Sequence, residues 1–250
     1  YNPIHQWLAN RGYAVLSVNF RGSTGFGKDF VNAGNLEWGA KMHDDLIDAV
    51  DWAVGEGIAD PDRVAIMGGS YGGYATLVGL TFTPEAFACG VDMVGPSNLT
   101  SLIETIPAYW QPEIEVFATR MGDHRTEEGR KLLRERSPIN HVEKIERPLL
   151  ICQGANDPRV NQNESDQIVG AMQDRAIPVT YVLYPDEGHG SARPENRMSF
   201  YAVAEAFLSL HLGGRFEPIG DDFENSSITV PVGAEEVSGL KEALSDGFAG

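Results

Sequence analysis

The sequence is poor in cysteine and in basic residues, and it has no long hydrophobic run. Only Cys89 and Cys152 occur among 250 residues, and each lies in an apolar, strand-like segment, which favours two reduced structural thiols over a disulfide. Lys and Arg number 19 against 36 Asp and Glu, giving a net charge of -17. Such a surface repels nucleic-acid phosphates and anionic lipid headgroups. No apolar stretch approaches the ~20 residues that span a bilayer. We therefore expect neither nucleic-acid binding nor membrane insertion.

The chain begins at Tyr1 without the methionine, basic region or apolar region that open a secretory signal. We therefore expect a fragment whose true N-terminus lies upstream. The missing signal leaves a cytoplasmic or a periplasmic location open for a protein that we expect to be soluble. Carboxylates gather at 44–51, but no histidine or cysteine spacing completes a metal site. We interpret them as the solvated face of a helix and expect neither a metal nor another cofactor.

From Gly12 onward, apolar strand-like segments alternate with helical patterns. Such alternation is typical of an α/β fold, a mostly parallel sheet with helices on both faces. Prolines and aromatic residues interrupt 95–120, so we expect irregular or broken helix there, lying over the sheet edge and shaping a pocket. Strands are predicted at 13–18, 63–67, 88–94, 149–152 and 179–183, and helices at 42–54, from about 70, around 168–172 and at 195–212.

Length and composition divide the chain into one large domain and a terminal segment. Its 250 residues can bury one substantial core, and 42% hydrophobic with 22% charged residues is typical of a folded domain. We assign that domain to residues 1–214. Residues 215–250 are rich in acidic and small residues without sustained periodicity. We interpret them as an acidic C-terminal tail or a packed extension, with a weak helical pattern at 235–244.

The strongest chemical signal is the pentapeptide GGSYG at 68–72, which matches the pattern G-x-S-x-G. It lies between a predicted strand and a predicted helix, where a sharp turn exposes the serine and leaves room only for glycine on either side. We therefore predict that Ser70 is a nucleophile. The turn also places Ser70 at a helix N-terminus, whose free N–H groups stabilise an oxyanion, and the N–H of Tyr71 is the expected donor.

A serine hydroxyl at neutral pH needs a base and a group that orients the base. Asp157 and His189 each follow a predicted strand, at 149–152 and 179–183. Both are thus expected at the carboxyl edge of the sheet, where catalytic groups gather. Glycines on both sides of His189 let its loop reach the serine, and histidine can accept and return a proton near neutral pH. Asp186 is the competing acid, but it lies only three residues before His189 on the same loop.

At these residues the sequence resembles the catalytic domain of the prolyl oligopeptidase family, above all its acylaminoacyl-peptidase-like and dipeptidyl-peptidase-like bacterial members. The resemblance covers about residues 1–214. It implies an α/β-hydrolase fold, serine peptidase activity on short peptides, and an upstream β-propeller domain that restricts access. The segments that carry it are NFRGSTGFG at 19–27, GGSYGGY at 68–74, SPINH at 137–141, NDPRV at 156–160 and EGHG at 187–190.

The resemblance further implies a role for Arg159 and a truncated N-terminus. In relatives the residue two places after the triad aspartate binds a substrate carbonyl, a role that suits an always charged guanidinium. The alternative for Arg159 is a surface salt bridge. The strand and the His-Gly-Gly-Pro-like turn of the family lie upstream of Tyr1, and with them the second oxyanion donor. We therefore expect the isolated chain to be unstable or prone to aggregation.

Two other functions stay open at this point. A carboxylesterase would use the same Ser70, His189 and Asp157 and would turn over esters only. A catalytically inactive hydrolase fold would serve as a binding module and would not react with a fluorophosphonate. The residue preferred before the scissile bond and the formation of a homo-oligomer are also left open.

Overall fold

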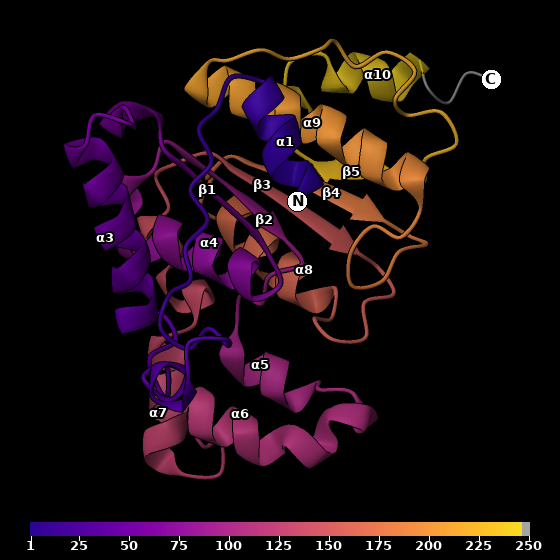
Figure 1. The fold of residues 1–250 in the computed structure, drawn as a ribbon. Helices are drawn as coiled ribbons and strands as arrows, with labels where there is room; N and C mark the ends of the chain where they lie inside the picture. The colour runs from indigo at the N-terminus through magenta and orange to yellow at the C-terminus, as the bar shows by residue number, and fades with distance from the viewer. Residues whose placement is uncertain (247–250) are drawn as a thin grey trace.

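A five-stranded sheet forms the centre of the computed structural model, which describes residues 1–246 (Figure 1). The first four strands are parallel, and the fifth pairs antiparallel with the fourth. The third strand is buried along its whole length, as a strand covered on both faces must be. The predicted mostly parallel sheet is confirmed. In spatial order the strands are β1 (Ala65–Gly69), β2 (Cys89–Met93), β3 (Leu149–Gly154), β4 (Val179–Tyr184) and β5 (Thr229–Val232).

Helices connect the strands and cover both faces of the sheet (Figure 1). The α-helices are α1 (Pro3–Asn10), α2 (Lys28–Asn32), α3 (Lys41–Gly55), α4 (Tyr71–Phe82), α5 (Leu99–Glu104), α6 (Ile114–Arg120), α7 (Glu127–Glu135), α8 (Asn163–Gln173), α9 (Pro194–Leu212) and α10 (Leu240–Asp246). Short 3₁₀ helices are η1 (Pro61–Arg63), η2 (Pro84–Ala86), η3 (Ala108–Glu113), η4 (Pro138–Lys144) and η5 (Ala234–Glu236).

Each face of the sheet has its own hydrophobic core, because successive side chains of a strand point to opposite faces. On one face, Leu150 of β3 packs in a cluster with Phe207 of α9. On the other face, Ile151 of β3 packs with Leu77 of α4 and Ile168 of α8. All five side chains are at most 2% exposed, and burial of each contributes about 1.5–3 kcal/mol. The two cores fix the sheet between its helical layers.

The segment between β2 and β3 folds as α5, η3, α6, α7 and η4. Its three α-helices lie together below the sheet in Figure 1. Pro112 lies inside η3, where it prevents a continuous α-helix. Buried Leu99, Leu102 and Met121 share a third core cluster with Tyr74 of α4. The predicted broken helix is confirmed, and its core contacts are to α4.

The expected strand at 13–18 is wrong. Residues 13–20 form no strand, and Val15 and Leu16 are 38% and 52% exposed. An extended segment becomes a strand only when its N–H and C=O groups pair with a neighbouring strand. Within residues 1–246, β1 is an edge strand that pairs with β2 alone. The apolar composition of residues 13–18 predicts an extended backbone, but it does not show whether a neighbouring strand is there to pair with it.

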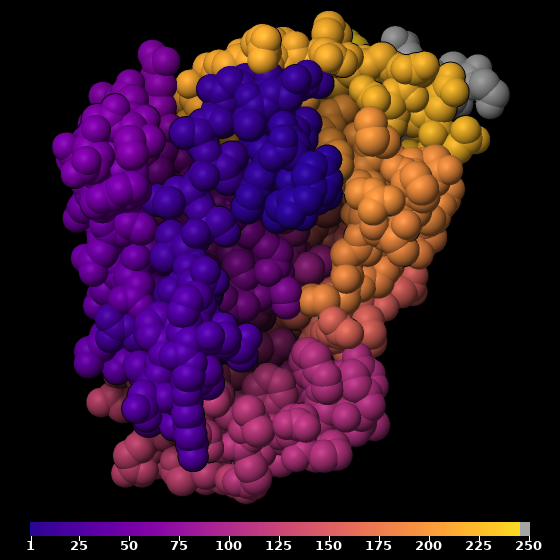
Figure 2. All heavy atoms as spheres, viewed as in Figure 1, coloured from indigo at the N-terminus to yellow at the C-terminus, as the bar shows by residue number. Residues whose placement is uncertain are grey.

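The chain after α9 packs against the sheet and against α9. Phe223, Ile228, Val237 and Leu240 are at most 5% exposed and belong to the core on the α9 face. Strand β5 extends the sheet beyond β4, and η5 and α10 fall where the weak helical pattern predicts helix. Figure 2 shows the yellow C-terminal part of the chain seated against the orange part. Residues 223–240 thus form the packed part of this C-terminal extension, and 247–250 of the expected tail lie outside the described residues.

The structure bears on two expectations from composition, the state of the cysteines and the lack of a membrane-spanning segment. Cys89 and Cys152 are free and buried, and burial raises the pKa of the Cys89 thiol to about 12, so the predicted structural thiols are confirmed. Among residues 1–246, no helix is both long enough and apolar enough to cross a membrane.

Candidate active site

Ser70 lies in a sharp turn between β1 and α4. Its φ and ψ are 57° and -115°, and a positive φ in a residue with a side chain costs on the order of 1–3 kcal/mol. Hydrogen bonds hold the turn from both sides. The Ser70 N–H donates to the carbonyl of Met93 at the end of β2 (2.8 Å), and the Ser70 carbonyl accepts from the N–H of Tyr74 in α4 (3.0 Å). The packed sheet and helix therefore keep the serine in this strained turn.

Glycine at position 68 is required by the close approach of strand and helix. A Cβ on Gly68 would lie 2.6 Å from the Cα and carbonyl carbon of Gly72, closer than such atoms come in proteins. A Cβ on Gly72 would meet nothing within 4 Å. The expectation that a side chain would not fit at either glycine is therefore confirmed for Gly68. It is wrong for Gly72, where the structure leaves room for a Cβ.

Gly68→Ala is therefore expected to distort the turn, because the obstructing atoms are backbone and cannot rotate away. We expect the free energy of unfolding to fall by about 1–3 kcal/mol or more. The matched control is Gly170→Ala in α8, whose Cβ meets nothing within 4 Å and which should gain roughly 0.5–1 kcal/mol. Denaturant titration of both variants measures the difference, and equal stabilities would contradict the prediction.

His189 lies between Ser70 and Asp157 and is hydrogen-bonded to both. Its Nε2 is 2.9 Å from Ser70 Oγ, and its Nδ1 is 2.6 Å from Asp157 Oδ2. The Asp157 side chain has no exposed surface and the His189 side chain exposes 14%, so little water competes for these bonds. Proton transfer from a hydroxyl to a base requires this contact distance. The structure thus brings together three side chains that lie 119 and 32 residues apart in the chain.

The loops that carry the acid and the histidine follow the neighbouring parallel strands β3 and β4, and their backbones touch. The Asn156 N–H donates to the carbonyl of Glu187 (2.9 Å). A Cβ on Gly154 would lie 2.2 Å from the carbonyl oxygen of Gly188, so only glycine permits this approach. Direct contact between the two loops fixes Asp157 relative to His189.

The two carboxylate oxygens of Asp157 have separate partners. Oδ1 accepts the backbone N–H groups of Arg159 (2.8 Å) and Val160 (3.0 Å), and Oδ2 faces His189. Backbone donors on one oxygen fix the orientation of a buried carboxylate. The turn after Asp157 therefore aims one oxygen at the imidazole ring.

Tyr71 is the first residue of α4, so its N–H has no partner one turn earlier in that helix. Its ring packs against Trp38 and Phe20, with centroids 4.6 Å and 5.2 Å apart. Burial raises the pKa of its phenol. The N–H lies next to Ser70 in the chain, and its role as oxyanion donor stays a prediction.

The Arg159 side chain is not held in the hydrogen-bond chain of Asp157, His189 and Ser70. It is exposed, and its guanidinium carbon lies 5.8 Å from the ring centroid of Trp110, a cation–π contact. Trp110 belongs to the segment expected to shape the pocket. The predicted contact with a substrate carbonyl is compatible with this position and stays a prediction.

The competing acid Asp186 lies elsewhere, and so does the buried histidine His43. Asp186 bonds to Arg193 and Asn196 rather than to His189. His43 is buried on α3 with Nε2 2.8 Å from Thr83 Oγ1, and burial lowers its pKa. Neither residue joins the three side chains above.

Sequence reasoning missed Asp92, because a single carboxyl group in an apolar strand has no motif. Asp92 is fully buried on β2, opposite Gly68 of β1. Its Oδ1 accepts the Gly95 N–H (2.9 Å), while Oδ2 has no partner among residues 1–246. A Cβ on Gly73 would lie 2.2 Å from Oδ1. Asp92 therefore sits beneath the serine turn and packs against the first turn of α4.

Asp92 is expected to make stability fall as pH rises. Burial raises its pKa to about 8, although the Gly95 N–H opposes the shift. Between about pH 4 and pH 8 the unfolded chain loses this proton while the folded chain keeps it, so the free energy of unfolding falls by up to about 1.4 kcal/mol per pH unit. Asp92→Asn removes the effect.

Denaturant titration at about pH 5 and about pH 8 measures this effect. The stability of Asp92→Asn relative to the wild type should increase between the two pH values. The neighbouring Cys152 does not contribute, because burial raises the pKa of its thiol and it stays neutral in both states. A difference between variant and wild type that is the same at both pH values would contradict the prediction.

Glu187 and Asn196 were also missed as site residues. Glu187 is 3% exposed and Asn196 is fully buried, and Asn196 Nδ2 donates to Glu187 Oε1 (2.8 Å). The only signal in the sequence is the acidic residue two places before His189. Asn196 carries none, because its partners come from distant segments.

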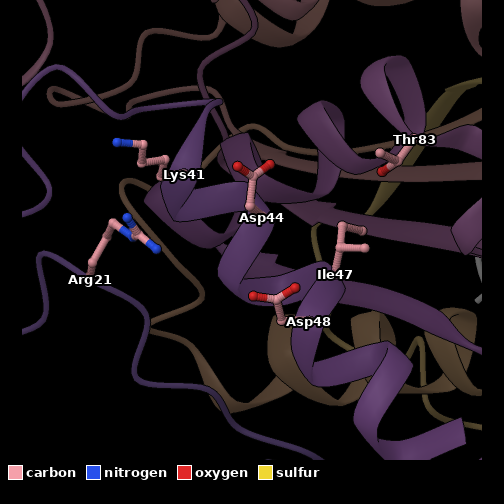
Figure 3. A pocket seen from close by; sticks show the side chains of 6 residues that line it. All are labelled: Arg21, Lys41, Asp44, Ile47, Asp48 and Thr83. Atoms are coloured by element: carbon pink, nitrogen blue, oxygen red, sulfur yellow. The ribbon is translucent and has the colours of Figure 1, made fainter. Parts of the chain in front are cut away.

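A surface hollow of about 600 Å³ lies apart from Ser70, His189 and Asp157 (Figure 3). Its two basic side chains have partners: Arg21 bonds to Asp45 through two nitrogens, and Lys41 pairs with Glu37. We assign it no chemistry. Its lining residues are Arg21, Lys41, Asp44, Ile47, Asp48 and Thr83.

The order serine, acid, histidine along the chain separates α/β-hydrolases from other enzymes that use these three side chains. Here the serine follows β1, the acid follows β3 and the histidine follows β4, all at the carboxyl edge of the parallel strands. The fold and the site therefore define an α/β-hydrolase.

Comparison with known proteins narrows this class. The sequence model of the prolyl oligopeptidase family matches residues 1–215. The chain belongs to this family of serine peptidases. It is 70% identical over 244 residues to dipeptidyl aminopeptidase BIII of Pseudoxanthomonas mexicana, covering 98% of this chain and 35% of that protein. It is 54% identical over 246 residues to dipeptidyl peptidase family member 6 of Caenorhabditis elegans, covering 98% and 33%.

A solved structure has the same fold. The puromycin-hydrolyzing peptidase of Mycobacterium tuberculosis superposes with a TM-score of 0.73 at 33% identity, over 81% of this chain and 30% of that one. The chain spans about a third of the length of the curated relatives named above.

Proposed function

We propose that this chain hydrolyses short peptides, with Ser70 as nucleophile, His189 as general base and Asp157 as the group that orients the histidine. The observation that carries the proposal is the unbroken hydrogen-bond chain from Asp157 Oδ2 through His189 to Ser70 Oγ. The strained turn at Ser70 and the buried, backbone-bonded Asp157 support it. The nucleophile is hydrogen-bonded to its general base, and the general base is hydrogen-bonded to the acid that orients it.

In the first half of the reaction, Ser70 Oγ attacks the peptide carbonyl carbon while His189 Nε2 takes the hydroxyl proton. The carbonyl oxygen becomes an oxyanion, which the N–H of Tyr71 stabilises at the N-terminus of α4. Asp157 stabilises the imidazolium that forms. The imidazolium then gives its proton to the leaving amine as the C–N bond breaks, and an ester of Ser70 remains.

In the second half, water takes the place of the departed amine. His189 Nε2 removes a proton from the water as its oxygen attacks the ester carbonyl, and the second oxyanion occupies the same donor. Return of the proton to Ser70 Oγ releases the carboxylic acid product. The same three side chains therefore serve both halves of the cycle.

For the substrate, we propose peptides with a free amino terminus that lose a dipeptide. The names of two similar proteins, a dipeptidyl aminopeptidase and a dipeptidyl peptidase, support this choice. The net charge of -17 favours approach of a cationic amino terminus. We propose further that Arg159 binds a substrate carbonyl, and that an upstream β-propeller of the whole protein restricts access to the site.

The test compares substrates on the whole protein, with Ser70→Ala as control for contaminating peptidases. A dipeptidyl anilide with a free amino terminus should be hydrolysed, and its N-acetylated form should be hydrolysed much more slowly. Turnover of short-chain esters alone would replace the proposal with a carboxylesterase. A protein that hydrolyses neither class and does not react with a fluorophosphonate would be an inactive binding module.

A further inference from the structure

The loop that carries His189 is closed on itself by a buried carboxylate. Glu187 Oε2 accepts the N–H of Ala192 (2.9 Å), and Oε1 accepts the N–H of Arg193 (2.9 Å). Glu187 is two residues before His189 and is 3% exposed. Both ends of the loop are therefore tied to one side chain whose position is fixed by burial.

Asn196 connects this loop to another part of the chain. It lies in the first turn of α9 and is fully buried. Its Nδ2 donates to Glu187 Oε1 (2.8 Å) and to Asp186 Oδ1 (3.0 Å). Its Oδ1 accepts the N–H of Ser227 (2.9 Å) and the hydroxyl of Ser226 (3.0 Å). The Asn196 amide thus uses both N–H donors on the loop that carries His189 and its oxygen on residues 226–227.

The same short segment makes further contacts with the loop and with the helix behind it. Arg193 Nη2 donates to the carbonyl of Asn225 (2.8 Å), and the Ser227 hydroxyl donates to Asp186. The Ser226 hydroxyl lies 2.8 Å from that of Ser199 in α9. Several independent hydrogen bonds therefore join residues 225–227 to both ends of the loop.

Buried apolar side chains fix the segment on both sides. Phe223 is 5% exposed and Ile228 is fully buried in the core on the α9 face. Directly afterwards, β5 pairs with β4, the strand from which the histidine loop leaves. The segment lies beyond residue 215, where the family match ends.

We propose that residues 223–228 are a positioning element for His189, acting through Asn196 and Glu187. The inference rests on the proposed function, because it assigns these residues to the placement of its general base. A displacement of about 1 Å at a catalytic group can lower a rate by about 10²-fold. Without the segment, the loop keeps its own Glu187 bonds but loses the contacts that join Asn196 and Arg193 to residues 225–227.

Two variants of the whole protein test the proposal. Asn196→Ala removes the connecting amide, and the double variant Ser226→Ala with Ser227→Ala removes only hydroxyl groups of the segment. We expect Asn196→Ala to lower kcat by about 10- to 10²-fold with KM changed by less than about two-fold. The double variant should lower kcat in the same way but less. The rate of labelling by a fluorophosphonate should fall in parallel.

The matched controls lie in the same extension, and among the described residues neither is hydrogen-bonded to the loop or to Asn196. Val237→Ala removes a buried side chain, 2% exposed, and should lower the unfolding midpoint while leaving kcat unchanged below that midpoint. Ser238→Ala, at an exposed position, should change neither quantity. If the segment had a purely structural role, kcat would instead fall in proportion to the loss of stability in every variant, Val237→Ala included.

The proposal is overturned if the folded double serine variant and Asn196→Ala both keep kcat within about two-fold of the wild type. If Asn196→Ala does not fold, the double variant decides alone. Loss of activity in Ser70→Ala together with full activity in these variants would overturn this inference and leave the proposed function standing. Activity retained in Ser70→Ala would overturn both.

Discussion

Replacing His189 by alanine is expected to lower kcat for peptide hydrolysis by about 10⁶-fold, as removal of one member of a cooperating triad does. The imidazole is the only group in hydrogen-bond contact with Ser70 Oγ among the described residues. Without it the hydroxyl has no acceptor for its proton, and the leaving amine has no donor. The residual rate should come from binding and from the oxyanion donor alone.

Steady-state kinetics on a dipeptidyl anilide measure this loss, with His5→Ala as the control. His5 lies on α1 and belongs to none of the loops that carry Ser70, Asp157 or His189, so its variant should keep the wild-type kcat. Circular dichroism of His189→Ala should be unchanged, because the ring is partly exposed and supports no core. A reduction of less than about 10²-fold would mean that another group takes the proton.

Asp157→Asn is expected to lower kcat by about 10⁴-fold while the fold is kept. The reason follows from the two backbone N–H groups that Oδ1 accepts. They require an acceptor, so the amide oxygen of asparagine takes their side and the NH₂ group points at His189 Nδ1. The ring must then carry its proton on Nε2, where it faces Ser70 and cannot accept another.

The control for this variant is Asp174→Asn, an exposed residue at the end of α8, which should leave kcat unchanged. The pH dependence gives a second measurement. Because the variant holds the wrong tautomer, raising the pH should recover little of the lost rate below the range in which hydroxide replaces the base. Full activity of Asp157→Asn near neutral pH would show that another group orients the histidine.

Much of the fold could be predicted from the sequence because its parallel strands are buried and apolar. The predicted strands at 149–152 and 179–183 lie within β3 and β4. Each has enough β-branched and aliphatic residues to be predicted from its own composition. The segment at 13–18 has the same composition and forms no strand, because a strand depends on a partner that composition does not encode. Strand β5 was not predicted, because its residues TVPV contain a proline. These residues form a strand because they pair with β4.

The three central residues of the site could be predicted because each follows a strand and has a distinctive chemical environment in the chain. Ser70 lies in a glycine motif, and His189 lies between two glycines. Asp92 and Asn196 had no such signal, and Glu187 had only its place two residues before His189. Their importance comes from burial and from partners far away in the sequence, such as Ser226 and Ser227, which only the packed structure brings together.

The glycines illustrate the same division. Gly68 and Gly154 both permit backbone contact that any side chain would block. The first could be predicted from its motif, whereas the second could not, because its neighbour is the loop of His189. Local patterns therefore predicted the three residues of the hydrogen-bond chain, and tertiary contacts determine how they are held.

The most direct test of the account is covalent labelling of the whole protein with a fluorophosphonate, followed by mass spectrometry of its peptides. We expect one equivalent of label, on Ser70, and almost none in His189→Ala, because only a serine whose proton is removed attacks phosphorus at an appreciable rate. Label on a different residue, or equal labelling of Ser70 in the presence and absence of His189, would contradict it.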